Sequence, residues 1–533
     1  MKKQEVAVIL LLALTGLAQA PRNNPPPPAT YFKVVQQYTP SVLHPFPTQW
    51  TLLDQHGKPF VYLGVYDVSP EFISSQIMQS RYGGDSTKWA THSLDRMQAA
   101  GFNAIDIYAS DYVLPVKTQA SKGATPQLPF MLYWPALNEV VSSPGHLGLP
   151  EAIKDVECSG QHQYGYGSAK GYCGYTLDVF DPKWQQANTA ELPIQVGRIG
   201  GGFATQQLVI GVSLGDATNV NSLAGNGSGA NGVPQYPHTG QLVATGNFQQ
   251  SGFKDPKVYS KYAWVAFIKS RYASIADLNG AWGTGGFYTS FDDPSQTFGT
   301  GKSVLAEDGR HKWFGAGDFF NQSGMDSVLK ADLDDFLYQF ALQAYAVQAK
   351  TVRSYDKNHL FACGSFGGSG NGGTRPQVLH ALHDAGCNIV VLNWNSRFAV
   401  ASLATDQQEA KTFGGGVMVW YGTTACPDSP YCPGDQWSNQ PTQLARGQEY
   451  ARDVAAIFKA KFLGIVLWGL TDKPSEKDNW GLISAPLDNL YDGKCAVRAA
   501  SKDQWGFPCG GEAVDYGDFF HGIAQANAAA KGN

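Results

Sequence analysis

The sequence lacks the short motifs by which bound metal ions and phosphate groups are most easily recognised. None of its eight cysteines has the spacing of a zinc site, and the motif His-Glu-x-x-His does not occur. The glycine-rich segment 367–373 is not followed by Lys-Ser or Lys-Thr, which indicates a flexible loop rather than a phosphate cradle. We therefore expect no metal and no cofactor.

Charged residues are also few, at 16% of the chain, and the formal net charge is -5. The basic residues are scattered rather than gathered in a stripe, so the sequence does not indicate a nucleic-acid partner. Beyond the N-terminal segment, no apolar run has the length of a membrane span, so we expect no integral span there.

The N-terminus has the pattern of an export signal. Two lysines precede an apolar run over residues 6–18 that is too short to span a membrane, and residues 18–20 form a small-x-small cleavage site. Pro21 follows that site and tends to hinder cleavage, so an uncleaved anchor is the alternative. We expect residues 1–20 to be a signal peptide, 21–50 a Pro-rich linker and N-terminal extension, and the protein to be secreted or periplasmic.

The even number of cysteines is typical of an oxidising compartment. Three pairs lie close together in loops rich in Gly, Pro and Tyr, where local disulfides are expected: Cys158 with Cys173, Cys426 with Cys432, and Cys495 with Cys509. Cys363 and Cys387 lie instead on apolar, strand-like runs, and for them the sequence favours buried thiols.

Eight short apolar runs alternate with helical segments along the chain. These runs are 60–66, 104–108, 130–134, 208–214, 359–364, 388–392, 417–420 and 463–468. A parallel strand buried on both faces is continuously apolar, and eight such strands with helices between them predict an α/β fold, a (β/α)8 TIM barrel. A doubly wound sheet is the alternative, but 64–67 is not the glycine-rich phosphate turn that it would require.

We expect the barrel to occupy residues 51–484. Two long insertions, 221–250 and 284–326, follow the fourth strand, and they would lie near the C-terminal mouth where barrels of this kind carry their sites. Residues 485–533 are expected to form a short C-terminal extension with a disulfide.

Several segments resemble the glycoside hydrolases that have retaining (β/α)8 barrels. The most specific is Arg271–Gly283 with 288–293, which is similar to the stretch after the acid/base strand in β-agarase and β-galactosidase families. Weaker likenesses are found at 97–104, 178–184 and 468–472, so that the resemblance extends from about residue 50 to 495. It implies a protein that hydrolyses O-glycosyl bonds in a polysaccharide of the galactan or β-glucan type.

Both glutamates that such barrels use are absent from their expected positions. The resemblance places one at the end of strand four, on Asp216-Ala217, and the other at the end of strand seven, on Trp420 or Tyr421. Hydrolysis needs two carboxyl groups about 5–5.5 Å apart for retention, or roughly 6.5–9.5 Å apart for inversion. The ordinary mechanism therefore cannot be transferred to this chain.

Other acidic residues near predicted strand ends could replace them. Asp216 is the candidate acid, although a turn or helix-capping role fits it equally well, and Glu139 and Asp472 are further catalytic candidates. Asp67 and Asp111 are candidate ligands for sugar hydroxyls. Asp106 lies within the second strand and is expected to make a buried hydrogen bond.

Aromatic and amide side chains recur at the predicted C-terminal ends of the strands. They are Tyr66, Tyr108, Trp134, Trp394 between Asn393 and Asn395, Trp420, Tyr421 and Trp468. Core packing explains any single one, but their recurrence where this fold carries its site favours a saccharide-binding cleft. Two hypotheses follow: a glycoside hydrolase with a non-standard carboxylate set, or a catalytically inactive carbohydrate-binding barrel.

Overall fold

The computed structural model describes the barrel strands and most of the surrounding helices. The described residues are 31–37, 49–71, 73–114, 127–133, 206–214, 259–297, 299–307, 311–314, 326–367, 375–425, 439–472, 480–484 and 519–532, with short pieces at 153–154, 175–176, 179–180, 182, 185–186, 188–189 and 489–490. The statements below concern these residues.

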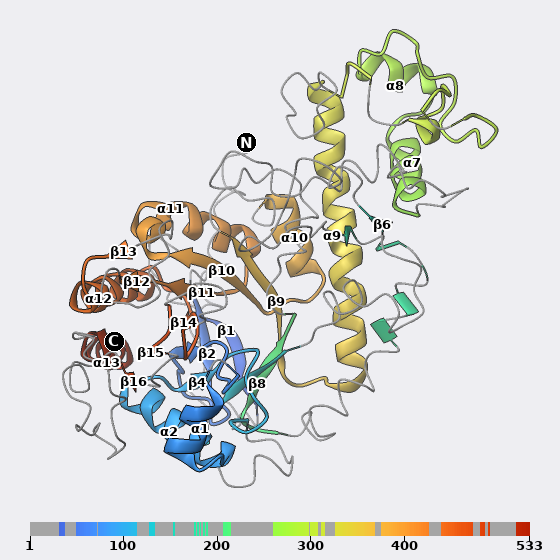
Figure 1. Ribbon diagram of the computed structural model, residues 1–533. Coiled ribbons are helices and arrows are strands. Elements are labelled where there is room, and N and C mark those ends of the chain that lie inside the picture. The colour runs from blue at the N-terminus through green and yellow to red at the C-terminus, as the bar shows by residue number, and fades with distance from the viewer. Residues whose placement is uncertain are drawn as a thin grey trace, which may run out of the picture.

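Eight parallel strands form a closed barrel, so the predicted TIM barrel is confirmed (Figure 1). In chain order they are β3 (Tyr62–Val65), β4 (Ala104–Ile105), β5 (Phe130–Tyr133), β8 (Val209–Ser213), β9 (Leu360–Gly367), β10 (Ile389–Asn395), β11 (Gly416–Gly422) and β14 (Gly464–Leu467). Each pairs with its neighbour in the chain, and β14 closes the ring on β3. Every one of the eight predicted apolar runs overlaps one of these strands.

Helices surround the barrel. They are α1 (Ser75–Tyr82), α2 (Ser86–Ala99), α9 (Ser327–Tyr355), α10 (Pro376–Asp384), α11 (Ser396–Phe413), α12 (Gln443–Lys459) and α13 (Phe519–Gly532). Side-chain caps fix where several begin: the carboxylate of Asp85 accepts hydrogen bonds from the first backbone N–H groups of α2, and Thr442 caps α12 in the same way. Minor pieces are β6 (Ile153–Lys154), β7 (Tyr175–Thr176), η4 (Val304–Ala306), β12 (Thr424–Ala425), β13 (Asn439–Gln440), β15 (Ile483–Ser484) and β16 (Asn489–Leu490).

The helix α13 belongs to the outer ring of the barrel. Tyr450 on α12 donates a hydrogen bond to Asn527 on α13 at 2.9 Å, and the Asn527 amide donates to the carbonyl of Ala100 after α2 at 2.9 Å. Gly447 and Gly522 let α12 and α13 approach closely, since a Cβ on Gly522 would lie 2.8 Å from Gly447. The outer layer thus continues beyond residue 484, where the sequence interpretation had ended the barrel.

A two-stranded hairpin closes the end of the barrel at which the strands begin. It consists of β1 (Lys33–Gln37) and β2 (Gln49–Leu53), which are antiparallel. Phe32 contacts Phe60, just before β3, with ring centroids 5.2 Å apart, and both Phe32 and Leu52 are buried. The apolar residues of the hairpin therefore extend the core inside the barrel.

The helix α9 is much longer than the barrel needs and carries a small helical module. At about 1.5 Å per residue its 29 residues span roughly 43 Å. Helices α7 (Tyr259–Arg271) and α8 (Ile275–Ala281) lie beside its N-terminal part, away from the barrel (Figure 1).

The segment that most resembles the glycoside hydrolases builds the core of this module. Asp332 on α9 is buried, and its carboxylate accepts hydrogen bonds from Trp282 at 2.7 Å and from Tyr272 at 2.6 Å. Arg271 approaches the same carboxylate at 3.1 Å. Three residues of the segment 271–283 thus bind one buried carboxylate, two by hydrogen bonds and one as an ion pair. These contacts give the motif a structural role.

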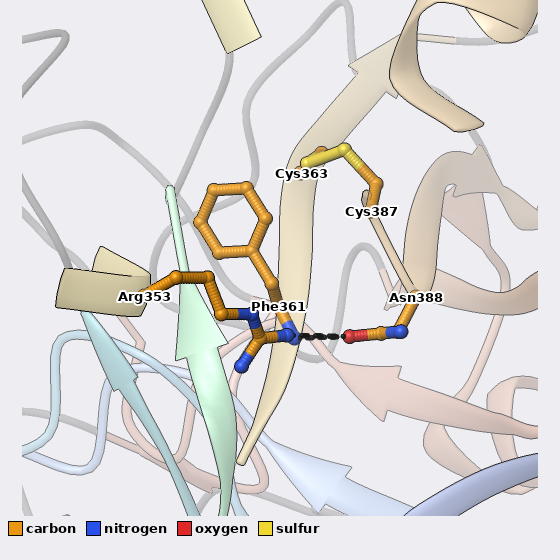
Figure 2. Close-up of a disulfide and its surroundings, with 5 residues drawn as sticks. All are labelled: Arg353, Phe361, Cys363, Cys387 and Asn388. Carbon is orange, nitrogen blue, oxygen red and sulfur yellow. Dashed lines mark hydrogen bonds between the residues drawn. A yellow bond between two sulfur atoms is a disulfide. The ribbon is translucent and has the colours of Figure 1, made fainter. Parts of the chain in front are cut away.

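A disulfide joins Cys363 on β9 to Cys387, just before β10 (Figure 2). The prediction of two buried thiols is therefore wrong: the sequence cannot show that the parallel pairing of β9 and β10 brings these Cα atoms to 5.7 Å. Asn388 ties the same corner, because its side-chain oxygen accepts from the backbone N–H of Phe361 at 2.9 Å and from Arg353 at 3.0 Å. The three other cysteine pairs lie outside the described residues. Of the helices that the structure describes, none has the length and apolar character of a membrane span.

Candidate functional site

Aromatic rings gather at the C-terminal mouth of the barrel. Tyr66 follows β3, Trp468 follows β14, and Trp420 lies near the end of β11. The ring of Tyr66 lies 5.0 Å from that of Trp420 and 5.2 Å from that of Trp468, and the two tryptophan rings lie 5.4 Å apart. Because the strands are parallel, their ends meet at one edge, and three rings predicted to share the mouth do so.

The cluster extends on both sides through the predicted Tyr108 and through two rings, Tyr133 and Trp480, that the sequence did not indicate. Tyr133, the last residue of β5, lies 4.2 Å from Tyr108, which in turn lies 5.3 Å from Tyr66. Trp480, in the loop after β14, lies 5.3 Å from Trp468. We call these six residues (Tyr66, Tyr108, Tyr133, Trp420, Trp468 and Trp480) the mouth cluster. Of the other predicted site residues, Trp134 lies outside the described residues.

The rings of the mouth cluster differ in their access to solvent. Trp420 is 1% exposed, whereas Tyr108 and Tyr133 are only partly buried. A ligand at the mouth would therefore meet Tyr108 and Tyr133 first, with Trp420 as the floor beneath. Asn393, Trp394 and Asn395 lie on β10, and their backbone pairs in register with residues 420–422 of β11.

A pocket of about 870 Å³ opens beside Tyr66 and Tyr108. Asp67, Glu71 and Asp111 also line it, so the two predicted hydroxyl ligands Asp67 and Asp111 share one pocket with two of the predicted aromatic residues. Asp67 has φ = 53° and Tyr108 has φ = 60°. A bulky residue in the left-handed region is strained, and such residues are concentrated at functional sites.

Strand β11 presents an aromatic ring where the resemblance requires the nucleophile. Successive side chains of a strand point to opposite faces. Trp420 packs inside the barrel, whereas the hydroxyl of Tyr421 donates to Asp453 on α12 at 2.9 Å, in the layer between strands and helices. Tyr421 therefore lies apart from the mouth cluster with which the sequence had grouped it.

The three carboxylates predicted to be catalytic are not brought together by the described residues. Asp216 and Glu139 lie outside them. Asp472 is 1% exposed, and its Oδ1 accepts the backbone N–H of Gly481 at 2.9 Å, next to Trp480. Its backbone N–H donates to Ile483 at 3.0 Å. These contacts give Asp472 an anchoring role in the loop after β14. In the part of the chain that the structure describes, no group of three His, Cys, Asp or Glu residues could hold a metal ion.

Asp106 makes the buried hydrogen bond expected of it. Its Oδ2 accepts the hydroxyl proton of Tyr62 at 2.8 Å, and its Oδ1 accepts the backbone N–H of Ile107 at 2.7 Å. Burial raises the pKa of Asp106 to about 6, although both hydrogen bonds act in the opposite direction.

We expect this carboxyl group to make stability depend on pH. Its pKa is higher in the folded state than the ordinary value of 3.8, so folding favours the protonated form. The stabilisation is complete below about pH 4 and declines towards pH 6, by at most about 1.4 kcal/mol per pH unit. Urea unfolding of Asp106→Asn at pH 4, 5, 6 and 7 should lack this decline. Equal pH slopes in variant and wild type would contradict the assignment.

Comparison with known proteins identifies solved structures that share the fold of this barrel. No family model matches the sequence, and no curated protein matches it. Solved structures do match: an exo-β-agarase has a TM-score of 0.61 at 14% identity, and an agarase, AgWH50C, has 0.61 at 15%. The chain shares its (β/α)8 barrel fold with these two agarases.

The matches cover most of this chain but only part of each agarase. Each covers 95% of this chain but 66% of the agarase chain, so the present chain spans slightly less than two thirds of either protein. BpGH50 matches with a TM-score of 0.56 at 12% identity, and there 82% of that chain is covered. At such identities the likeness establishes the barrel fold alone, and the chemistry depends on the residues at the mouth.

Proposed function

We propose that this protein binds a galactan-type polysaccharide at the barrel mouth and does not hydrolyse it by the two-glutamate mechanism. The observation that carries the proposal is Trp420, whose buried ring occupies the interior at the end of β11. A tryptophan cannot attack an anomeric carbon or exchange a proton at neutral pH. It can form the apolar floor of a sugar site.

The chemistry of the pocket supports a saccharide ligand. The partly exposed ring of Tyr108 offers a flat apolar face, against which the C–H groups of a sugar ring can stack. Asp67 and Asp111, which line the same pocket, can accept hydrogen bonds from sugar hydroxyls. The likeness to agarases supports a galactan over other polymers.

Export of the protein is part of the same proposal. A galactan-type polysaccharide would be encountered outside the cytoplasm, and residues 1–20 have the pattern of a signal peptide. The disulfide between Cys363 and Cys387 supports an oxidising compartment.

Hydrolysis by a rearranged carboxylate set is the second candidate function. One strained residue, Tyr108, adjoins an acid-lined pocket, and that combination is found in active sites. Product analysis after incubation with agarose, another galactan and a β-glucan separates the two functions. Release of reducing sugar that is abolished in Asp216→Asn would establish hydrolysis with Asp216 as the acid. Retention of the protein on polymer without any product supports binding alone.

The binding proposal is tested most directly at Tyr108. Replacing it with alanine removes the accessible ring and should weaken affinity for agarose oligosaccharides about tenfold, which is about 1.4 kcal/mol. Affinity electrophoresis and calorimetry measure this change.

The matched control is Tyr262→Ala, because Tyr262 is an exposed tyrosine (42%) on α7, outside the mouth cluster. It should leave affinity unchanged. Equal affinities in wild type and Tyr108→Ala would remove Tyr108 from the site.

A further inference from the structure

The side of α12 that faces the barrel carries charged residues where a barrel helix normally has apolar ones. Arg446, Glu449 and Asp453 follow one another at spacings of three and four, so they share one face of the helix. They are 0%, 5% and 0% exposed. Ionisable residues are almost never so deeply buried unless they are paired, so each one requires an explanation.

Arg446 holds the loop after β14. Its Nη2 donates to the carbonyl oxygen of Trp480 at 2.6 Å and to that of Gly481 at 3.1 Å. On the other side its guanidinium stacks over the ring of Phe519 on α13, 3.7 Å from the centroid. A planar group fixed in this way sets the position of the Trp480 backbone, since it bridges two successive carbonyls.

Glu449 and Asp453 hold the end of β11. Thr423 donates its hydroxyl proton to Oε2 of Glu449 at 2.9 Å, and Tyr421 donates to Oδ2 of Asp453 at 2.9 Å. Tyr421 follows Trp420 in β11, and Thr423 comes directly after the strand. The end of the strand is thus bonded to α12 at two points, which limits how the ring of Trp420 can turn.

These two anchor points act on the same row of rings. Trp420 contacts Trp468, and Trp468 contacts Trp480, at centroid distances of 5.4 and 5.3 Å. The charged face of α12 therefore bonds to the chain next to Trp420 and to the backbone of Trp480, the two ends of this row.

We infer that the charged face of α12 positions Trp420 and Trp480 for saccharide binding, with Arg446, Glu449 and Asp453 as positioning residues. This inference rests on the proposed saccharide site. A purely stabilising role is the competing explanation, but well-packed apolar residues often stabilise as much as buried ions do. Compared with apolar residues, hydrogen-bonded buried polar groups can restrict their neighbours to one arrangement.

The test uses two variants that release one anchor each and one that releases neither. Tyr421→Phe removes the hydroxyl group that donates a hydrogen bond to Asp453. Arg446→Met removes the N–H groups that donate to the carbonyl oxygens of Trp480 and Gly481. The matched control is Tyr450→Phe: its hydroxyl lies on the same helix but bonds to Asn527 of α13. Each variant is measured for its thermal midpoint, for its affinity towards agarose oligosaccharides, and for the tryptophan bands of its near-UV circular dichroism, at wavelengths where tyrosine does not absorb.

We expect Tyr421→Phe and Arg446→Met to weaken affinity at least about fivefold and to alter the near-UV spectrum. Tyr450→Phe should lower the thermal midpoint while affinity and spectrum stay as in the wild type. Arg446→Lys, which keeps a positively charged hydrogen-bond donor group, should recover part of the affinity. The inference is overturned if affinity follows the thermal midpoint in all variants alike, or if the spectra of Tyr421→Phe and Arg446→Met are unchanged. A wild-type protein without affinity for any saccharide would refute the proposed function instead, and the spectra would still decide whether α12 positions the rings.

Discussion

Replacing Trp420 with alanine is expected to lower the free energy of unfolding by about 3–5 kcal/mol and to abolish retention on insoluble galactan. The side chain is 1% exposed and contacts both Tyr66 and Trp468, so its removal leaves a cavity inside the barrel that its neighbours cannot fill without moving. Since the mouth cluster packs on this ring, the loss should reach the site itself. Chemical denaturation and a pull-down on agarose beads measure the two effects.

Two further variants separate stability from binding in this experiment. Trp264 is equally buried, in the module beside α9, so Trp264→Ala should destabilise the protein while retention persists. Trp420→Phe keeps an aromatic ring and gives up no hydrogen bond within the described residues, so it should retain part of the binding. Full retention by Trp420→Ala under folding conditions would show that the mouth cluster is not the saccharide site.

Removal of the disulfide is expected to have the next largest effect. Cys363 and Cys387 are 24 residues apart in sequence, and closing a loop of that length stabilises the folded state by about 3.5 kcal/mol through the entropy of the unfolded chain. The double variant Cys363→Ala, Cys387→Ala should therefore unfold at a clearly lower denaturant concentration. The bond links β9 to the start of β10, so the barrel itself is affected rather than a surface loop.

Substitution is preferable to a reducing agent here, because six other cysteines are present in the chain. Adding reductant to the double variant gives the matching control: any further destabilisation belongs to those six. A denaturation midpoint equal to that of the wild type would mean that Cys363 and Cys387 do not form the bond in solution.

The barrel could be predicted because nearly all the strand residues whose burial is described are buried, so that the strands are largely apolar. The ends of the strands were harder to predict where the sequence contains residues, such as glycine, that are unfavourable in strands. The fifth run was expected to end at Gly364, whereas β9 continues to Gly367. Strand β10 pairs with residues 365–367 there, and this pairing offsets the low strand propensity of glycine.

The candidate site was less predictable, because the direction of a side chain depends on register. Trp420 and Tyr421 are adjacent and both aromatic, and only the position of the strand in the barrel decides that one faces inwards. The left-handed backbone of Tyr108 has no signal in its residue type. Trp480 reaches the cluster from a loop, so no strand periodicity could indicate it.

The contact between α13 and the turn after α2 has a consequence for how the chain folds. Asn527 and Ala100 are separated by 427 residues, yet a single hydrogen bond joins them. A barrel in which helices this far apart in sequence support each other cannot complete its outer ring until both of them have left the ribosome. During synthesis the strands made first must therefore remain without the neighbour that closes the ring.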